Sequence, residues 1–203
     1  MNTERLMAFS DGVFAIAITL LILEIKIPKH HDLEEAGGLY AYLFKIWPSY
    51  LSYVVSFFVI GVYWSNHHWL FTFVKKTDHK LNMLHLFFLM GICFLPFSTA
   101  IMGDYIMDEH YQNAAVSAYC LSLLLPLLPL IPLCLYATHK NRLVDDNLNR
   151  GFINRLTVKL FTGFVIQFIA YLLSFNYPMV ALGVISLSTM SYFLPPESPV
   201  YDE

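Results

Sequence analysis

Residues 5–28, RLMAFSDGVFAIAITLLILEIKIP, decide the fold of this chain. The stretch starts with Arg5, Ser10 and Asp11 and then runs apolar from position 12 to position 23. In a helix, which turns about 100° per residue, Ser10 and Asp11 point roughly 120° and 140° away from Ile16. Another face carries a stripe of residues that all lie within roughly 60° of Ile16: Gly12, Ile16, Thr19, Leu20, Leu23 and Ile27. The stretch therefore predicts one helix with a polar pair on one side and an apolar stripe on another.

The composition is that of an integral membrane protein. Of the 203 residues, 57% are hydrophobic and 13% are charged, whereas about 25% of residues are charged in ordinary soluble domains. The net charge of −3 provides no basic surface for nucleic acid, so the expected partner is the lipid bilayer. Cys93, Cys120 and Cys134 lie in apolar runs without CxxC spacing, which indicates neither disulfides nor a thiolate metal site. The first apolar run has no small-residue cleavage site, so the first helix is expected to remain in the protein.

Apolar segments of about 20 residues can cross the hydrocarbon core of a bilayer. The sequence predicts an all-α membrane protein in which one domain, residues 1–203, contains six such helices. Their approximate bounds are 5–27, 46–71, 81–102, 112–136, 152–174 and 177–194. The connection 138–151 is polar, and the tail 195–203 is expected to be disordered.

Lysine and arginine are divided unequally between the two sets of connections. If the N-terminus is inside the cell, the inner side holds Arg5, Lys75, Lys76, Lys80, Lys140, Arg142, Arg150, Arg155 and Lys159. The outer side then holds only Lys26, Lys29 and Lys45. Because cytoplasmic loops carry the excess of these residues, both termini of this multi-pass protein are expected to be cytoplasmic.

Polar residues of the first three predicted helices should lie at one depth, near the cytoplasmic surface. These residues are Ser10 and Asp11 in the first helix, Asn66, His67 and His68 in the second, and Asn82 and His85 in the third. A carboxylate, two amides and three imidazoles can satisfy one another there by hydrogen bonds. Such a layer would hold the first helix against the next two.

Three interpretations of this layer stay open. It can be a purely structural network, or His67, His68 or His85 can sense protons, because the imidazole pKa lies near neutrality. The third interpretation is a metal site made of Asp11 and the three histidines, although adjacent histidines on a helix diverge by about 100°. No pair of histidines with HExxH spacing is present, so an intramembrane metalloprotease is disfavoured, and no enzymatic activity is expected.

The apolar stripe also has two interpretations. Ile16, Leu20 and Leu23 follow the i, i+4, i+7 spacing of an ordinary helix-packing seam. If several copies of the helix surround an axis, the same side chains form apolar rings with the Thr19 hydroxyls between them, and such rings can gate a pore by dewetting. A carbonyl filter is not expected, because the sequence has no TVGYG-like segment.

A different class of function is the alternative to a pore. A proton-coupled or ion-coupled secondary transporter could use the layer of Asp11, His67 and His85 as its coupling site. Transporters of this kind commonly contain internal repeats and helices broken at mid-membrane. No internal repeat is visible in this sequence, which speaks against the alternative.

A family resemblance favours the pore. The motif Arg5-x-x-x-Phe9-Ser10-Asp11 at the start of a first membrane helix resembles the signature of the transmembrane protein 175 family, the endosomal and lysosomal potassium channels and their prokaryotic relatives. The His-bearing segment 64–68 and the segment 82–97 with Pro96-Phe97 are also similar to this family. The likeness covers essentially the whole chain. Since animal members carry two six-helix units, this single unit resembles a prokaryotic member, for which the plasma membrane is the expected location.

The resemblance implies a homotetramer in which four copies of the first helix line a central pore without a P-loop filter. It implies a leak-type channel that is permeable to potassium, prefers potassium over sodium and needs no cofactor beyond the permeant ion. The positions that it implies for the constriction and for selectivity are Ile16, Thr19, Leu20 and Leu23. It assigns a structural role, through bonds to His and Asn of the next two helices, to Arg5, Phe9, Ser10 and Asp11.

Overall fold

A computed structural model of the chain describes residues 3–192 and 198–201. The prediction of an all-α protein is confirmed. The elements are α1 (Thr3–Leu20), the 3-10 helix η1 (Leu21–Glu24), α2 (His30–Ala36), α3 (Leu39–Lys45), α4 (Trp47–Thr72), α5 (His79–Tyr105), α6 (Gln112–Thr138), the 3-10 helix η2 (His139–Asn141), α7 (Arg150–Ser174) and α8 (Pro178–Ser191).

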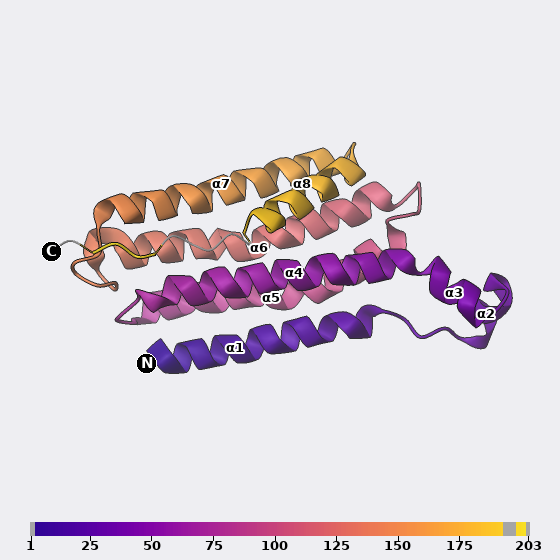
Figure 1. The fold of residues 1–203 in the computed structure, drawn as a ribbon, viewed down its shortest axis with the longest axis horizontal. Helices are drawn as coiled ribbons and strands as arrows, with labels where there is room; N and C mark the ends of the chain where they lie inside the picture. The colour runs from indigo at the N-terminus through magenta and orange to yellow at the C-terminus, as the bar shows by residue number, and fades with distance from the viewer. Residues whose placement is uncertain (1–2, 193–197, 202–203) are drawn as a thin grey trace.

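The long helices form an elongated bundle in which they run roughly side by side (Figure 1). Helix α1 lies on one flank and packs against α4 and α5, while α6 packs between α5 and the pair α7 and α8. The two chain termini lie at the same end of the bundle, and the short helices α2 and α3 lie at the opposite end (Figure 1). The hydrophobic core is densest along α5 and α6, where both helices are largely surrounded by their neighbours.

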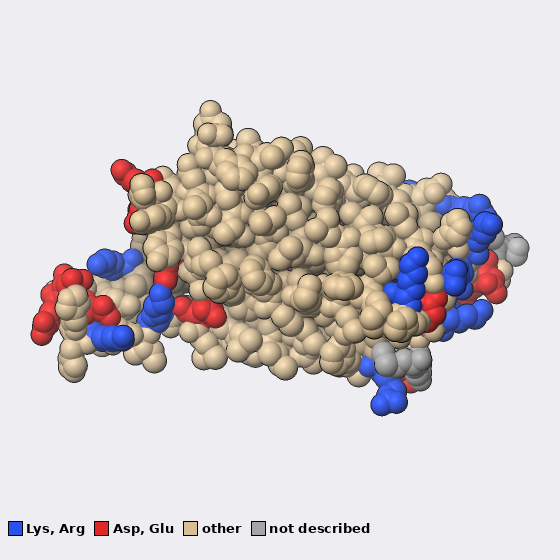
Figure 2. All heavy atoms as spheres, turned by 180° about the vertical axis from the view of Figure 1, so that it is seen from behind, with Lys and Arg blue, Asp and Glu red and all other residues tan. Residues whose placement is uncertain are grey.

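Within the described residues, four helices are long and apolar enough to cross a membrane: α1 continued by η1, α5, α6 continued by η2, and α7. Helices α3 and α4 pass the same test together but are bent by 48° relative to each other, which raises the number to five if the pair is one span. Figure 2 shows a broad band without Lys, Arg, Asp or Glu between two charged ends. These features define a membrane protein in which four or five helices of the described residues are long and apolar enough to span the bilayer.

The predicted helices differ from the observed ones most at the following places. Residues 5–27 are not one α-helix, because the chain changes to a 3-10 helix at Leu21 and is extended at Ile25 (φ −79°, ψ 106°). Helix α3 precedes the predicted second helix and was not expected from the sequence. The predicted segment 177–194 corresponds to the 14-residue α8, and its positions 193–194 lie outside the described residues.

Local sequence explains where several helices begin. Asp78 precedes α5 and accepts a hydrogen bond from the Leu81 N–H (2.9 Å), and Asn149 caps α7 in the same way through Phe152 (3.1 Å). Such side-chain caps satisfy backbone donors that have no partner inside the helix. Proline occupies the first turn of α4 and α8, where its missing N–H costs no helical hydrogen bond.

The connections at the end that carries both termini are joined by backbone contacts. Val74 pairs with Val144 in an isolated β-bridge, and the Lys75 N–H donates to the Leu143 carbonyl (2.8 Å). The Asn149 N–H donates to the carbonyl of Val200 (2.9 Å). The expected disorder of the tail is therefore wrong for residues 198–201, while residues 195–197 and 202–203 lie outside the described residues.

Candidate functional site on helix α1

Helix α1 has one covered and one uncovered face. Leu6, Ser10, Phe14 and Ala17 are buried against the bundle, and their 4-4-3 spacing follows the helical period. The other face of α1 points away from α4 and α5, at the edge of the bundle (Figure 1). The helix therefore presents a surface that its own subunit leaves open.

Three large apolar side chains of the predicted stripe lie on this open surface. The exposed fraction is 61% for Ile16, 40% for Leu20 and 72% for Leu23. Thr19 lies among them and is also exposed. The structure therefore places these four residues on one surface of α1 and η1 that the described part of the subunit leaves exposed.

The hydroxyl of Thr19 is oriented by its own helix. Its Oγ1 lies 2.9 Å from the carbonyl oxygens of both Ala15 and Ile16, to which the single hydroxyl proton is donated. The lone pairs of the hydroxyl oxygen consequently stay available as acceptors. In a ring of such helices, this oxygen could contact a cation or its water.

The stripe ends where η1 ends. After η1 the chain is extended, and Ile27 is exposed there without belonging to a helical face. Lys26 forms an ion pair with Asp104 at the far end of α5. This pair raises the pKa of Lys26, chiefly through the hydrogen bond to the Asp104 carboxylate. The ion pair links the chain just after η1 to α5, at the end of the bundle opposite the termini.

A small polar cluster lies on the covered face of α1. Ser10 Oγ lies 2.9 Å from Nε2 of His85 on α5, and this nitrogen lies 3.0 Å from Nε2 of His67 on α4. All three side chains are at most 1% exposed. The cluster therefore joins α1, α4 and α5 at a single buried point.

The hydrogen-bond geometry indicates how the cluster shares its protons. Ser10 donates its only hydroxyl proton to the Leu6 carbonyl (2.8 Å), so its oxygen acts as the acceptor for His85 Nε2–H. The nearby Nε2 of His67 is then also an acceptor. Nδ1 of His85 is buried and has no hydrogen-bond partner among the described residues. Aromatic rings close the site, since His67 stacks on Phe88 with 5.3 Å between the ring centroids.

Asp11 does not belong to this cluster, although the sequence led us to expect it there. It is exposed and accepts a hydrogen bond from Trp64 Nε1 on α4 (2.9 Å). Its expected place among the imidazoles is wrong because the 100° step from Ser10 turns it out of the covered face. Sequence reasoning missed Trp64 as the partner. The available signal was that an indole N–H can only donate, and that Trp64 lies at the depth of Asp11.

The other expected members of the layer are also dispersed. Asn66 donates to the Val62 carbonyl of its own helix (2.8 Å), and His68 is exposed beside the Trp64 ring. The Oδ1 atom of Asn82 is buried without a partner among the described residues. Arg5 and Phe9 are both exposed on α1. The layer thus reduces to Ser10, His67 and His85, with a separate contact between Asp11 and Trp64.

This dispersal bears on the metal-site interpretation of the layer and on the transporter alternative. In residues 3–192 and 198–201, no group of three or more His, Cys, Asp or Glu side chains is arranged to hold a metal ion. A transporter site would need the Asp11 carboxylate beside His67 and His85. The structure instead places the carboxylate on the exposed side of α1 and the imidazoles in the core.

Comparisons with known proteins agree with this architecture. The sequence model of the family described as "Endosomal/lysosomal potassium channel TMEM175" matches residues 5–96. A protein of Streptomyces collinus named potassium channel B446_29190 is 42% identical over 73% of this chain and 70% of its own length. The potassium channel Cha6605_3372 of Chamaesiphon minutus is 38% identical over 90% of this chain and 89% of its own length.

A solved structure has the same fold. The crystal structure of a lysosomal potassium-selective channel TMEM175 homologue from Chamaesiphon minutus superposes with a TM-score of 0.85 and 35% sequence identity. The match covers 95% of this chain and 96% of the other. The fold, the exposed surface of the first helix and the similarity to named channels define an all-α membrane protein of the ion-channel class. The chain belongs to the TMEM175 family.

Proposed function

We propose that this chain is the subunit of a leak-type potassium channel whose pore is lined by α1. Its relatives in Streptomyces collinus and Chamaesiphon minutus are named potassium channels. The single observation that carries the proposal is the exposed row of Ile16, Leu20 and Leu23 on a helix whose opposite face is packed. Such a row suits a surface that faces an axis shared by several subunits.

The pore requires more than one copy of the chain. Because the stripe points away from its own subunit, one α1 cannot enclose an axis, whereas four copies form a closed ring around it. We therefore propose a homotetramer. Each subunit is a single six-helix domain over residues 1–203, with α8 as the sixth crossing. The position of both termini at one end of the bundle supports an even number of crossings (Figure 1).

Orientation and location follow from the charges. The end with both termini also carries the 73–78 and 139–149 connections, which contain four of the twelve lysines and arginines of the chain. Five more lie in α1, α5 and α7 towards this end: Arg5, Lys80, Arg150, Arg155 and Lys159. By the positive-inside rule, we place this end in the cytoplasm and the chain in the plasma membrane. The Lys26–Asp104 pair then lies on the outer side, where it anchors the outer end of the pore helix.

In this proposal, Ile16 forms the constriction and Thr19, Leu20 and Leu23 line the pore beyond it. An apolar ring offers no ligand to replace ion hydration, so it favours the ion that gives up water most easily. Potassium is larger and less strongly hydrated than sodium, and therefore passes at lower cost. The free lone pairs of the Thr19 hydroxyls provide a partial substitute for that water. The buried cluster of Ser10, His67 and His85 holds α1 in the rotation that turns the stripe residues away from the rest of the subunit.

Ion flux into liposomes that contain the Ile16→Asn variant tests the proposal. An amide at the constriction supplies polar ligands, so we expect a higher total flux and a smaller preference for potassium over sodium. Ile169→Asn is the matched control, because Ile169 is 47% exposed on α7, away from α1. Unchanged flux in Ile16→Asn, or an equal change in the control, would contradict the assignment of Ile16.

A further inference from the structure

A cavity of about 290 Å³ lies between α4, α6, α7 and α8, on the side of the subunit away from α1. Apolar side chains such as Leu127, Leu156 and Leu160 make up most of its wall. Its size is close to the lower end of the range for small-molecule sites, roughly 300–1,000 Å³. The cavity shares no residue with the stripe of α1 or with the cluster of Ser10, His67 and His85.

Helix α8, which forms one wall of the cavity, is short. Its 14 residues rise about 21 Å, which is less than the roughly 30 Å of the hydrocarbon core. Ser188, Ser191 and Tyr192, at the last turn of α8, border the cavity. Beyond that turn, α4 and α7 continue towards the end of the bundle that holds both termini (Figure 1), where the Val200 carbonyl accepts a hydrogen bond from the Asn149 N–H.

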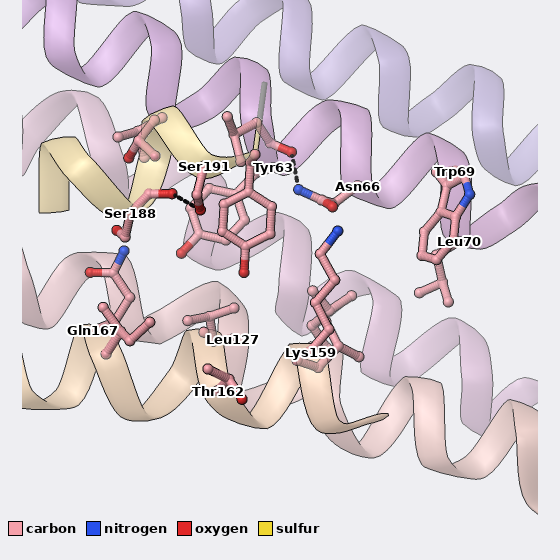
Figure 3. A pocket seen from close by; sticks show the side chains of 18 of the residues that line it. Tyr63, Asn66, Trp69, Leu70, Leu127, Lys159, Thr162, Gln167, Ser188 and Ser191 are labelled. Carbon is pink, nitrogen blue, oxygen red and sulfur yellow. Dashed lines mark hydrogen bonds between the residues drawn. The ribbon is translucent and has the colours of Figure 1, made fainter. Parts of the chain in front are cut away.

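A cation lies at one side of this cavity. Lys159 projects from α7 towards Asn66 of α4 (Figure 3). Its Nζ lies 5.9 Å from the ring centroid of Trp69 and 5.2 Å from that of Tyr192. In the described part of the chain, no carboxylate forms an ion pair with it. A lysine between two aromatic rings is typical of the boundary between lipid headgroups and hydrocarbon.

We propose that this cavity binds an anionic phospholipid from the leaflet at the Lys- and Arg-rich end of the bundle. The lipid phosphate pairs with Lys159, and one acyl chain lies along the leucine-lined wall. Charge complementarity selects the headgroup, since Lys159 forms no ion pair with a carboxylate of the described residues. The leucine-lined wall selects the acyl chain, since an elongated apolar group of the bilayer matches these side chains.

Gln167 limits how deeply the acyl chain of the lipid enters the cavity. It lies eight residues after Lys159 on α7, about 12 Å further along the helix, and borders the opposite end of the cavity (Figure 3). Its Oε1 atom is buried without a hydrogen-bond partner among the described residues. An unpaired acceptor beside hydrocarbon is unfavourable, so the acyl chain should bind better when this amide is removed.

Native mass spectrometry of the full chain, purified in detergent, tests the proposal. Phosphatidylglycerol or phosphatidylcholine with identical acyl chains is added in equal amounts, and the fraction of subunits that retain one lipid is measured. We expect the wild type to retain phosphatidylglycerol about fivefold better than phosphatidylcholine, from one basic contact. Lys159→Gln should lose this preference and Lys159→Arg should keep it. Lys76→Gln, the control at the same end but outside the cavity, should also keep it.

Two further variants test whether an acyl chain of the lipid occupies the cavity. Ser188→Phe fills the cavity and should lower retention of both lipids, whereas Gln167→Leu should raise it. The proposal is overturned if the wild type retains both lipids equally, or if Lys76→Gln loses as much preference as Lys159→Gln. It is also overturned if Ser188→Phe binds lipid like the wild type. A loss of retention in Gln167→Leu would show that the cavity holds a polar ligand instead.

Discussion

The hydroxyl oxygen of Ser10 on α1 lies 2.9 Å from Nε2 of His85 on α5. Together with the burial of Leu6, Phe14 and Ala17, this contact defines the rotation of α1 about its own axis. Ile16 comes six residues later and therefore points about 120° away from Ser10, out of the subunit. The same rotation of α1 thus buries the polar contact and exposes the stripe. A substitution at Ser10 should therefore change the orientation of the stripe residues as well.

Ser10→Ala is expected to destabilise the protein. The substitution leaves Nε2–H of His85 without its partner on α1, and a lost hydrogen bond between membrane helices costs about 1–2 kcal/mol. Thermal unfolding in detergent should show a melting temperature lower by a few degrees, together with a lower yield of assembled protein. Ser65→Ala is the control, because Ser65 is exposed on α4. Equal melting temperatures for both variants would contradict a structural role of the Ser10 contact.

Asp11 and Trp64 should be energetically coupled. The Trp64 indole donates to Asp11 Oδ1 at 2.9 Å, so Asp11→Asn, which keeps an acceptor oxygen, should be tolerated better than Asp11→Ala. In a double-mutant cycle of Asp11→Ala and Trp64→Phe, we expect a coupling energy of about 0.5–1.5 kcal/mol. The measurement is the unfolding free energy or the yield of assembled channel. Strictly additive effects would show that the contact contributes nothing.

Gly91→Ala should disrupt the packing of α5 on α6. A Cβ atom at Gly91 would lie 2.7 Å from the backbone nitrogen of Pro126 and 2.9 Å from the carbonyl carbon of Leu125. Backbone atoms cannot move aside as a flexible side chain can, so we expect a loss of about 1–3 kcal/mol in unfolding free energy.

Gly61→Ala is the matched control for this clash. A Cβ atom at Gly61 on α4 would meet nothing within 4 Å, and alanine is the better helix former by about 1 kcal/mol. Gly61→Ala should therefore be neutral or stabilising in the same thermal unfolding assay. Equal changes in melting temperature for Gly91→Ala and Gly61→Ala would contradict the close approach of α5 and α6 at Pro126.

The stability of the protein should depend on pH through Asp78, at the start of α5. This carboxylate accepts hydrogen bonds from the Leu81 N–H and the Tyr136 hydroxyl, and Arg142 lies 3.6 Å away. These groups, with the Leu81 N–H first, lower the pKa of Asp78 below its ordinary 3.8. A pKa that is lowered on folding contributes stability above the unfolded pKa, and this contribution is lost as pH falls through the folded pKa.

Asp78→Asn isolates this contribution, because asparagine keeps the helix cap but does not titrate. At pH 7 we expect the wild type to have the higher melting temperature, and below pH 3.8 the difference should shrink towards zero. Melting curves of both proteins between pH 7 and pH 3 provide the measurement. A difference that is the same at pH 3 and pH 7 would contradict the role of the charge.

The amino-acid sequence by itself determined the class of the protein. Its low charge content and long apolar segments identify a helical membrane protein, because charged residues cannot line helices that face hydrocarbon. The 3.6-residue period identified the stripe of α1, since positions on one helix face depend only on local geometry. The sequence does not show whether this stripe faces lipid, a neighbouring helix or a pore, because all three environments accept the same apolar side chains.

Only the tertiary structure decided which polar groups meet. The Nε2 atoms of His67 and His85 lie 3.0 Å apart. Asp11 instead accepts a hydrogen bond from Trp64, and Asn66 donates to a carbonyl of its own helix. The physical reason is that helices at one depth can still be rotated relative to one another, and about 100° of rotation per residue separates adjacent positions. Depth is read from the sequence, but the rotation of each helix is set by packing along the whole bundle. The same packing leaves Ile16 exposed and buries Ser10.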